Sequence, residues 1–169
     1  MQYIPSRLEK AISDILIQKN ILYPRDLRKE TLSKAFGVEI FYNHVSTYSY
    51  KKGEYTAIVL NKHGDPKEQN FMFYHELAHI ILHSGNQLNE EHYFIWRQEL
   101  DANIVAHYVA VPYHMRNYIE FNRSDLVELM SDMFFVPQKV IKKRLKQIYE
   151  RVKNQDTKCK NKIDFRFAF

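Results

Sequence analysis

The segment from residue 65 to residue 83 constrains the fold of this chain most strongly. It opens with Asp65-Pro66-Lys67-Glu68, which combines a capping side chain, a proline at the first helical position and a glutamate three residues after the cap. A mainly apolar run follows, and Ser84-Gly85 comes directly after it. We therefore predict a well-capped helix from Pro66 to about His83, around which the rest of the fold must be built.

The predicted helix carries the sequence His75-Glu76-Leu77-Ala78-His79. On an α-helix, His75 and His79 differ by about 40° in azimuth and about 6 Å in height, so both imidazoles can bind one metal ion. Glu76 is offset by about 100° from His75, which lets its carboxylate reach a water molecule at the metal without acting as a ligand. This spacing predicts a zinc site with Glu76 as the general base. Solvated histidines, or histidines hydrogen-bonded within the core, are the less favoured alternative.

A catalytic zinc ion needs three protein ligands and one open position, so a third donor must come from another element. We choose Glu99, which lies 20 residues after His79 on the next predicted helix. Alanines at 102, 106 and 110 would let the two helices approach closely. Asn103 is a candidate to fix the tautomer of a ligand histidine through its amide oxygen. The alternatives are a surface ion pair for Glu99 and an ordinary polar position for Asn103.

Several other histidines and tyrosines lie near this motif in the sequence. His83 continues the histidine spacing, but its azimuth has drifted by about 80° from that of His75, so we expect it to support the site or the helix end and not to bind the metal. A donor for the oxyanion formed during hydrolysis is also needed. Nothing in the spacing selects one from the candidates His92, Tyr93, His107 and Tyr113.

The remaining periodicities predict an α+β fold. N-terminal helices are expected over residues 6–18 and 24–36, followed by a small three-stranded antiparallel sheet from three β-rich segments at 38–42, 48–50 and 54–60. The motif helix and a helix over 90–111 form a two-helix zincin-like core. Two helix-turn-helix-like helices follow, beginning near residues 124 and 137. We expect a metallopeptidase core over 1–112, a helical subdomain packed on it over 113–153, and a basic tail over 154–169.

Composition and charge narrow the class of protein further. Residues 138–169 hold 11 Lys and Arg against 3 Asp and Glu, although the whole chain has only 25 against 20. A basic end of this kind is typical of a solvated helix face and leaves weak, non-specific nucleic-acid binding open. The single cysteine excludes a disulfide framework, and no apolar run approaches the roughly 20 residues of a membrane span. We expect a cytoplasmic protein that does not enter a membrane.

The residues described so far resemble one known family. His75-Glu76-Leu77-Ala78-His79 with His83, then Glu99 and Asn103, then a helix ending at Val111-Pro112, is similar to the ImmA/IrrE family of metallopeptidases. The resemblance covers roughly residues 4–150. It implies a zinc-dependent, gluzincin-like endopeptidase in which His75, His79 and Glu99 are the ligands and Glu76 is the catalytic glutamate. It also implies that the substrate is a helix-turn-helix repressor, often of a phage or mobile element, whose inactivation induces its genes.

Two other functions compete with this interpretation. The chain could be a non-catalytic, zinc-containing regulatory protein that acts by binding a repressor. It could also bind DNA through the helix pair at 124–150, using Lys139, Lys142, Lys143 and Lys146. We favour packing as the role of that pair, because it shows no evident set of base-reading side chains.

Overall fold

The computed structural model describes residues 3–82 and 92–164. It confirms the α+β class: helices predominate, and the described residues form one small sheet. In chain order the elements are α1 (Arg7–Gln18), the 3₁₀ helix η1 (Pro24–Leu27), α2 (Lys29–Phe36), β1 (Glu39–Asn43), β2 (Tyr48–Lys52), β3 (Tyr55–Asn61), α3 (Pro66–Leu82), α4 (His92–Ala110), the 3₁₀ helix η3 (Tyr113–Tyr118), α5 (Leu126–Phe134) and α6 (Gln138–Asp164).

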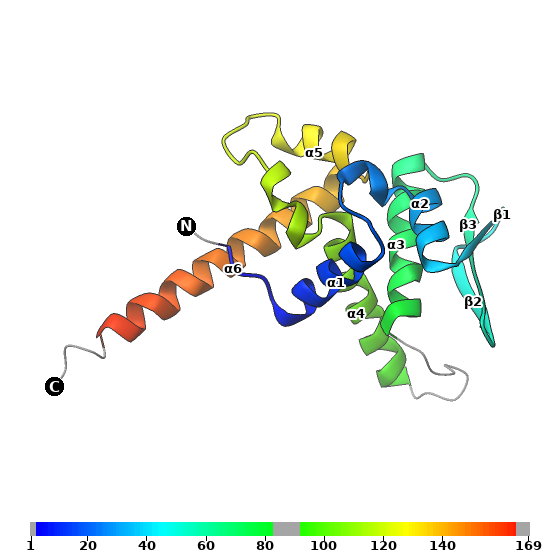
Figure 1. The fold of residues 1–169 in the computed structure, drawn as a ribbon, viewed down its shortest axis with the longest axis horizontal. Helices are drawn as coiled ribbons and strands as arrows, with labels where there is room; N and C mark the ends of the chain where they lie inside the picture. The colour runs from blue at the N-terminus through cyan, green and yellow to red at the C-terminus, as the bar shows by residue number, and fades with distance from the viewer. Residues whose placement is uncertain (1–2, 83–91, 165–169) are drawn as a thin grey trace.

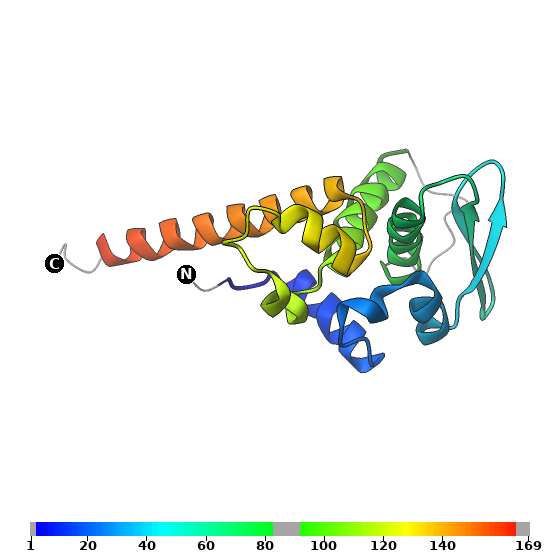
Figure 2. The ribbon, with the colours of Figure 1, turned by 90° about the horizontal axis from the view of Figure 1, so that it is seen from above.

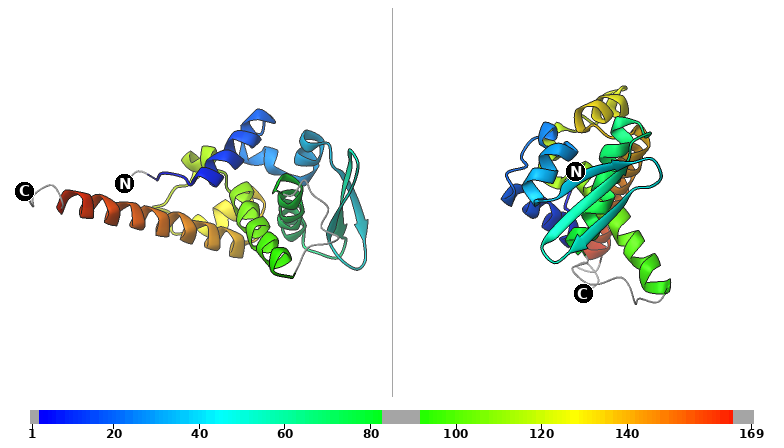
Figure 3. Two further views of the ribbon diagram at one scale, coloured as in Figure 1. Left: turned by 90° about the horizontal axis from the view of Figure 1, so that it is seen from below. Right: turned by 90° about the vertical axis from the view of Figure 1, so that its right-hand side faces the viewer.

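Helices α3 and α4 form the centre of the molecule and pack along each other (Figure 1). The sheet covers one side of α3, and the right-hand view of Figure 3 shows the sheet face that is turned away from that helix. Helix α6 packs on α4 and α5 with its first part, and its C-terminal part extends away from the body (Figure 2). The central helix pair therefore lies between the sheet and the C-terminal helices.

Local hydrogen bonds and one glycine determine where several of the helices start and end. The Asp65 carboxylate accepts the backbone N–H of Lys67 at 2.8 Å and that of Glu68 at 3.4 Å, which confirms the capped start of α3. Helix α1 begins with a capping box between Ser6 and Glu9. Gly37 ends α2 in the left-handed conformation, at φ 66°, which glycine adopts without strain.

The predicted helix over residues 24–36 is divided in the structure. Pro24 starts the 3₁₀ helix η1, Arg28 is extended, and α2 begins only at Lys29. The cause is tertiary, because the backbone N–H of Lys29 donates to the buried amide oxygen of Asn70 on α3 at 2.7 Å. That hydrogen bond replaces the intrahelical one that a continuous helix would need.

The sheet is mixed, and the expectation of a purely antiparallel sheet was wrong. The strand order is β1-β3-β2, with β1 parallel to β3 and β2 antiparallel to it. The hairpin turn before β3 is confirmed, with Gly53 at φ 60°. Strand β3 takes the centre because it holds most of the apolar side chains of the sheet; Ala57, Ile58 and Leu60 are buried. Residues 44–47 then connect the two edge strands, about 10 Å apart, which four residues can span.

A buried ion pair joins the N-terminal helix to the last one. Arg144 on α6 and Glu9 on α1 are each 1% exposed and in direct contact, and the Tyr3 hydroxyl also donates to Glu9. The Arg144 Nε donates to the carbonyl of Val111 at 3.2 Å. The sequence suggested a separate tail after residue 153. In the structure, helix α6 continues to Asp164.

No helix among residues 3–82 and 92–164 combines the length and the apolar character needed to cross a lipid bilayer.

Candidate metal centre

Two histidines and one glutamate converge between α3 and α4. The Nε2 atoms of His75 and His79 lie 3.2 Å apart. The carboxylate of Glu99 faces both, with 3.1 Å from its Oε2 to the His75 Nε2 and 3.2 Å from its Oε1 to the His79 Nε2. These three side chains form the one such group of potential metal ligands among the described residues. The structure thus brings together the three residues that the sequence singled out.

The distances between these atoms fit a tetrahedral metal ion. In a tetrahedral zinc site with bonds of about 2.0–2.1 Å, neighbouring ligand atoms lie about 3.3 Å apart. The three separations of 3.1–3.2 Å are close to that value. Two imidazole nitrogens and a carboxylate are also a donor set that zinc prefers. The residues present therefore fit a zinc ion, and they leave a fourth position without a protein ligand, as a hydrolytic site requires.

Packing of the two helices explains why the glutamate can reach the histidines. The alanines at 102, 106 and 110 of α4 are fully buried, in agreement with the small-residue stripe seen in the sequence. Their small side chains let α4 lie close to α3. Farther from the centre, the His107 ring of α4 packs edge-on against Phe71 of α3 at 5.0 Å between ring centroids. The contact fixes the relative position of the helices two turns away from Glu99.

The side chains of the centre differ in their exposure. The exposed fraction is 9% for the His79 side chain, 17% for His75 and 54% for Glu99. The histidines are thus held by the packed face of α3, while the carboxylate lies at the solvent side. Of the three potential ligands, Glu99 is thus the most open to solvent among the described residues.

Glu76 lies against the sheet, where it is 8% exposed. Burial raises the pKa of its carboxyl above the ordinary range. Hydrogen bonds from the side chain and the backbone of Ser49 on β2 oppose that rise, and so does the nearby His75, whereas the charge of Glu99 adds to it. Glu76 is therefore positioned by the sheet and is separate from the group of three potential ligands, as its azimuth on the helix predicted.

Ser49 is a residue of the site that the sequence did not reveal. It lies in a strand 27 positions before Glu76, and no motif marks it. Only its place in the sheet register could have indicated it: Ser49 pairs with the fully buried Ile58, so both side chains lie on the sheet face that packs on α3.

The other candidates from the sequence do not belong to the group of three potential ligands, and some lie outside the described part. Asn103 follows Glu99 by one turn, and its backbone carbonyl binds the His107 Nδ1 at 2.7 Å. Burial lowers the pKa of His107. The Tyr113 hydroxyl donates to the carbonyl of Tyr3 at 3.4 Å, on another side of the molecule. His83 lies outside the described residues, as do the side chains of His92 and Tyr93.

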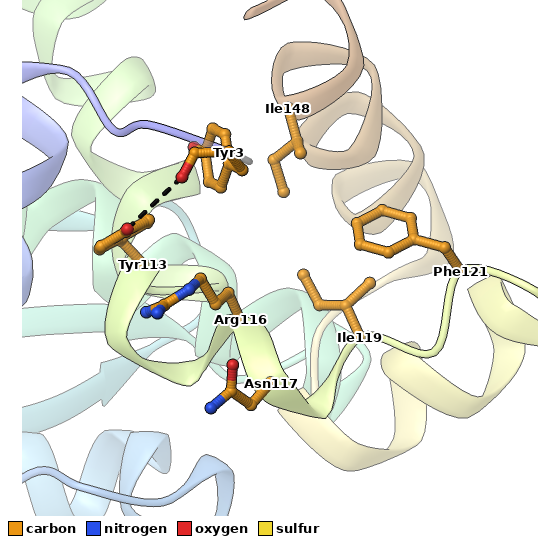
Figure 4. Close-up of a pocket in the computed structure, with 7 residues that line it drawn as sticks. All are labelled: Tyr3, Tyr113, Arg116, Asn117, Ile119, Phe121 and Ile148. Carbon is orange, nitrogen blue, oxygen red and sulfur yellow. Dashed lines mark hydrogen bonds between the residues drawn. The ribbon is translucent and has the colours of Figure 1, made fainter. Parts of the chain in front are cut away.

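A cavity of about 270 Å³ lies elsewhere in the molecule (Figure 4). It is formed by the N-terminal segment, η3, the loop after it and α6, and its lining residues are Tyr3, Tyr113, Arg116, Asn117, Ile119, Phe121 and Ile148. None of these residues belongs to α3, α4 or the sheet. The cavity is therefore not part of the candidate metal centre.

Comparison with known proteins finds one matching family and two related sequences. Residues 33–146 match a peptidase family described as the IrrE N-terminal-like domain. The chain is 27% identical over 150 residues to the phage-like element PBSX protein XkdA of Bacillus subtilis, covering 88% of this chain and 75% of XkdA. It is 25% identical to the uncharacterized protein YqaB of the same organism, covering 90% of each.

A solved structure shares the fold. It is titled as a Mycobacterium tuberculosis transcriptional regulator, and it superposes with a TM-score of 0.59 at 18% identity. The match covers 85% of this chain and 56% of that regulator, so the present chain spans little more than half of the longer protein.

Proposed function

Because the chain belongs to the IrrE N-terminal-like domain family of peptidases, we propose that it is a zinc-dependent endopeptidase. Its proposed substrate is a helix-turn-helix repressor of a phage or another mobile element, and its cleavage would induce the repressed genes. The name of XkdA ties that relative to a phage-like element, which supports this setting.

The observation that carries the proposal is the convergence of His75, His79 and Glu99 with a buried carboxyl group, Glu76, on the same helix as the histidines. These three residues would hold the zinc ion through two Nε2 atoms and a carboxylate. When bound, zinc supplies a Lewis acid that polarises the substrate carbonyl and makes water more acidic.

Proton transfer is the task of Glu76. Its carboxylate accepts a proton from the attacking water and then passes that proton to the nitrogen of the leaving amine. A raised pKa suits both steps, because a carboxyl group whose pKa is nearer to neutrality is a stronger base when ionised and is still a competent acid afterwards. Ser49 orients the group by its hydrogen bonds.

Strand β2 is the element best placed to hold the substrate. It is an edge strand of the sheet, and its Ser49 lies beside Glu76. An extended peptide can add to such an edge through main-chain hydrogen bonds. The cleavage site in the target is therefore expected in a loop or an interdomain linker, which can become extended without unfolding a domain.

Binding without catalysis is the alternative function. The lysines on α6 would be the natural contacts for DNA, but Lys139 pairs with Glu68 at 2.5 Å and Lys146 lies 3.8 Å from Glu150. Two of the four cations proposed for DNA contact thus already have acidic neighbours. We expect only weak, non-specific DNA binding from this face.

The Glu76→Gln variant tests the proposal. Glutamine keeps the shape and the hydrogen bonds of the side chain but cannot accept the proton, so cleavage should fall by about two to four orders of magnitude. The substrate to use is a helix-turn-helix repressor from the genome that encodes this protein. Mass spectrometry should find one discrete cut with the wild type. Glu68→Gln, an exposed change on the same helix, is the control and should cut normally.

A different result would favour the alternative. Equal inactivation of the repressor by the wild type and by Glu76→Gln, with no new peptide ends in either sample, would mean that the protein acts by binding.

A further inference from the structure

Strand β2 presents different side chains to its two faces. Ser49 is on the face that packs on α3, where it meets Glu76. Tyr48 and Tyr50, its neighbours in sequence, are on the opposite face and are 47% and 49% exposed. Two large aromatic side chains therefore lie on the same strand as a residue of the proposed active site, one position to either side of it.

The free edge of β2 links these tyrosines to the site. Among the described residues only β3 pairs with β2, so the other edge of β2 has no strand beside it. A peptide added there would place every second side chain on the outer face of the sheet. Those side chains would lie next to Tyr48 and Tyr50, while the remaining ones would face the side of Glu76.

We propose that Tyr48 and Tyr50 select the substrate by packing against two alternate side chains of the bound segment. The inference rests on the proposed peptidase function and names the substrate class: a segment with apolar or aromatic residues two positions apart. Cross-strand pairs between aromatic and β-branched or other aromatic side chains are favourable, which accounts for the preference.

Lys52 extends the pattern by one further position. It pairs with Tyr55 across the hairpin, so it lies on the same outer face as Tyr50, and it is exposed. An opposite charge placed directly beside it on a neighbouring strand is favourable. The selected segment therefore carries an acidic residue at the next alternate position beyond the two apolar ones.

The same face offers a control residue. Phe41 on β1 is 46% exposed, close to the values for Tyr48 and Tyr50, but it lies on the opposite edge strand. A partner that covered the whole sheet face would touch all three aromatic residues. A segment bound to the β2 edge would not depend on Phe41.

The experiment compares cleavage specificity among variants. The zinc-loaded wild type, Tyr48→Ser/Tyr50→Ser, Phe41→Ser and Glu76→Gln are each incubated with a peptide library made from a whole proteome. The new ends are sequenced by mass spectrometry. Equal zinc content and circular dichroism show that the variants are folded. KM and kcat are then measured with the peptide that the wild type cuts best.

The proposal predicts that wild-type cuts are flanked by two apolar positions with one residue between them, and by an acidic residue at the next alternate position. In the double variant this preference should disappear and KM should rise by about 2- to 30-fold, with kcat little changed. Phe41→Ser should behave as the wild type.

Each other outcome counts against a particular claim. Cuts without an alternating apolar preference, an unchanged KM in the double variant, or an equal effect of Phe41→Ser would overturn the selection by Tyr48 and Tyr50, while leaving the peptidase standing. No cutting by the wild type beyond that of Glu76→Gln would instead refute the peptidase function on which the inference rests.

Discussion

Glu76 has an environment that is unfavourable for a charged group in the metal-free protein. The carboxyl group is buried, and burial raises its pKa. As pH rises through the unfolded-state pKa, the unfolded chain loses this proton first, so it binds fewer protons than the folded chain and stability falls. Once pH exceeds the raised folded-state pKa, stability falls no further from this group.

This linkage predicts that Glu76→Gln stabilises the metal-free protein at neutral pH. Urea unfolding of both proteins in the presence of a chelator should give a higher free energy of unfolding for the variant at pH 7, and the difference should shrink toward zero near pH 4. Glu68→Gln should show no such gain, because Glu68 is exposed and paired with Lys139. A variant less stable than the wild type at pH 7 would contradict a buried Glu76 carboxyl group with a raised pKa.

At the residue scale, helical geometry made the central site predictable. The spacing of His75, Glu76 and His79 determines their directions on any α-helix, so no tertiary information was needed. Glu99 required one further step, the inference of close helix packing from alanines. Ser49 could not be found in this way, because its contact with Glu76 depends on how the sheet lies on α3.

At the scale of elements, the sequence predicted the strands but not their order. Alternation of apolar and polar residues indicates a strand and is silent about its neighbours. In the structure, strand β3 lies between β1 and β2, and its side chains Ala57, Ile58 and Leu60 are buried. The division of the predicted helix at 24–36 has a similar origin. The buried Asn70, which lies outside that segment, accepts the backbone N–H of Lys29.

The sheet order has a functional consequence at the same scale. Because β3 is central, β2 becomes an edge strand, and it is the edge strand that carries Ser49. In a sheet with β2 at the centre, the proposed substrate edge beside Glu76 would not exist. The observed strand order thus supports the proposed mode of peptide binding.

At the scale of the whole molecule, the Glu9–Arg144 pair ties the first helix to the last. Both side chains are 1% exposed, so removing one partner would leave the other charge buried without compensation. Arg144→Met should therefore lower the free energy of unfolding by about 3–5 kcal/mol. Combining Arg144→Met with Glu9→Leu should recover much of that loss, as urea titrations can show.

The pair also bears on the predicted division into a core and a C-terminal subdomain. If the two parts unfolded independently, Arg144→Met would broaden or split the unfolding transition of α6 and leave the rest unchanged. A single cooperative transition that shifts as a whole is expected, because Arg144 contacts α1 and also the carbonyl of Val111.

For the ion pair itself, a Glu9→Leu/Arg144→Met double variant no more stable than Arg144→Met alone would contradict the role of the buried charge.

The central claim is that His75, His79 and Glu99 together hold a zinc ion, and the zinc content of purified variants tests it most directly. Inductively coupled plasma mass spectrometry should find one zinc per chain in the wild type, in His83→Ala and in Asp101→Asn, a matched change on α4 two residues from Glu99. Glu99→Ala should lose most of the metal, because only two ligands remain. An unchanged zinc content in Glu99→Ala would contradict the account and remove that residue from the site.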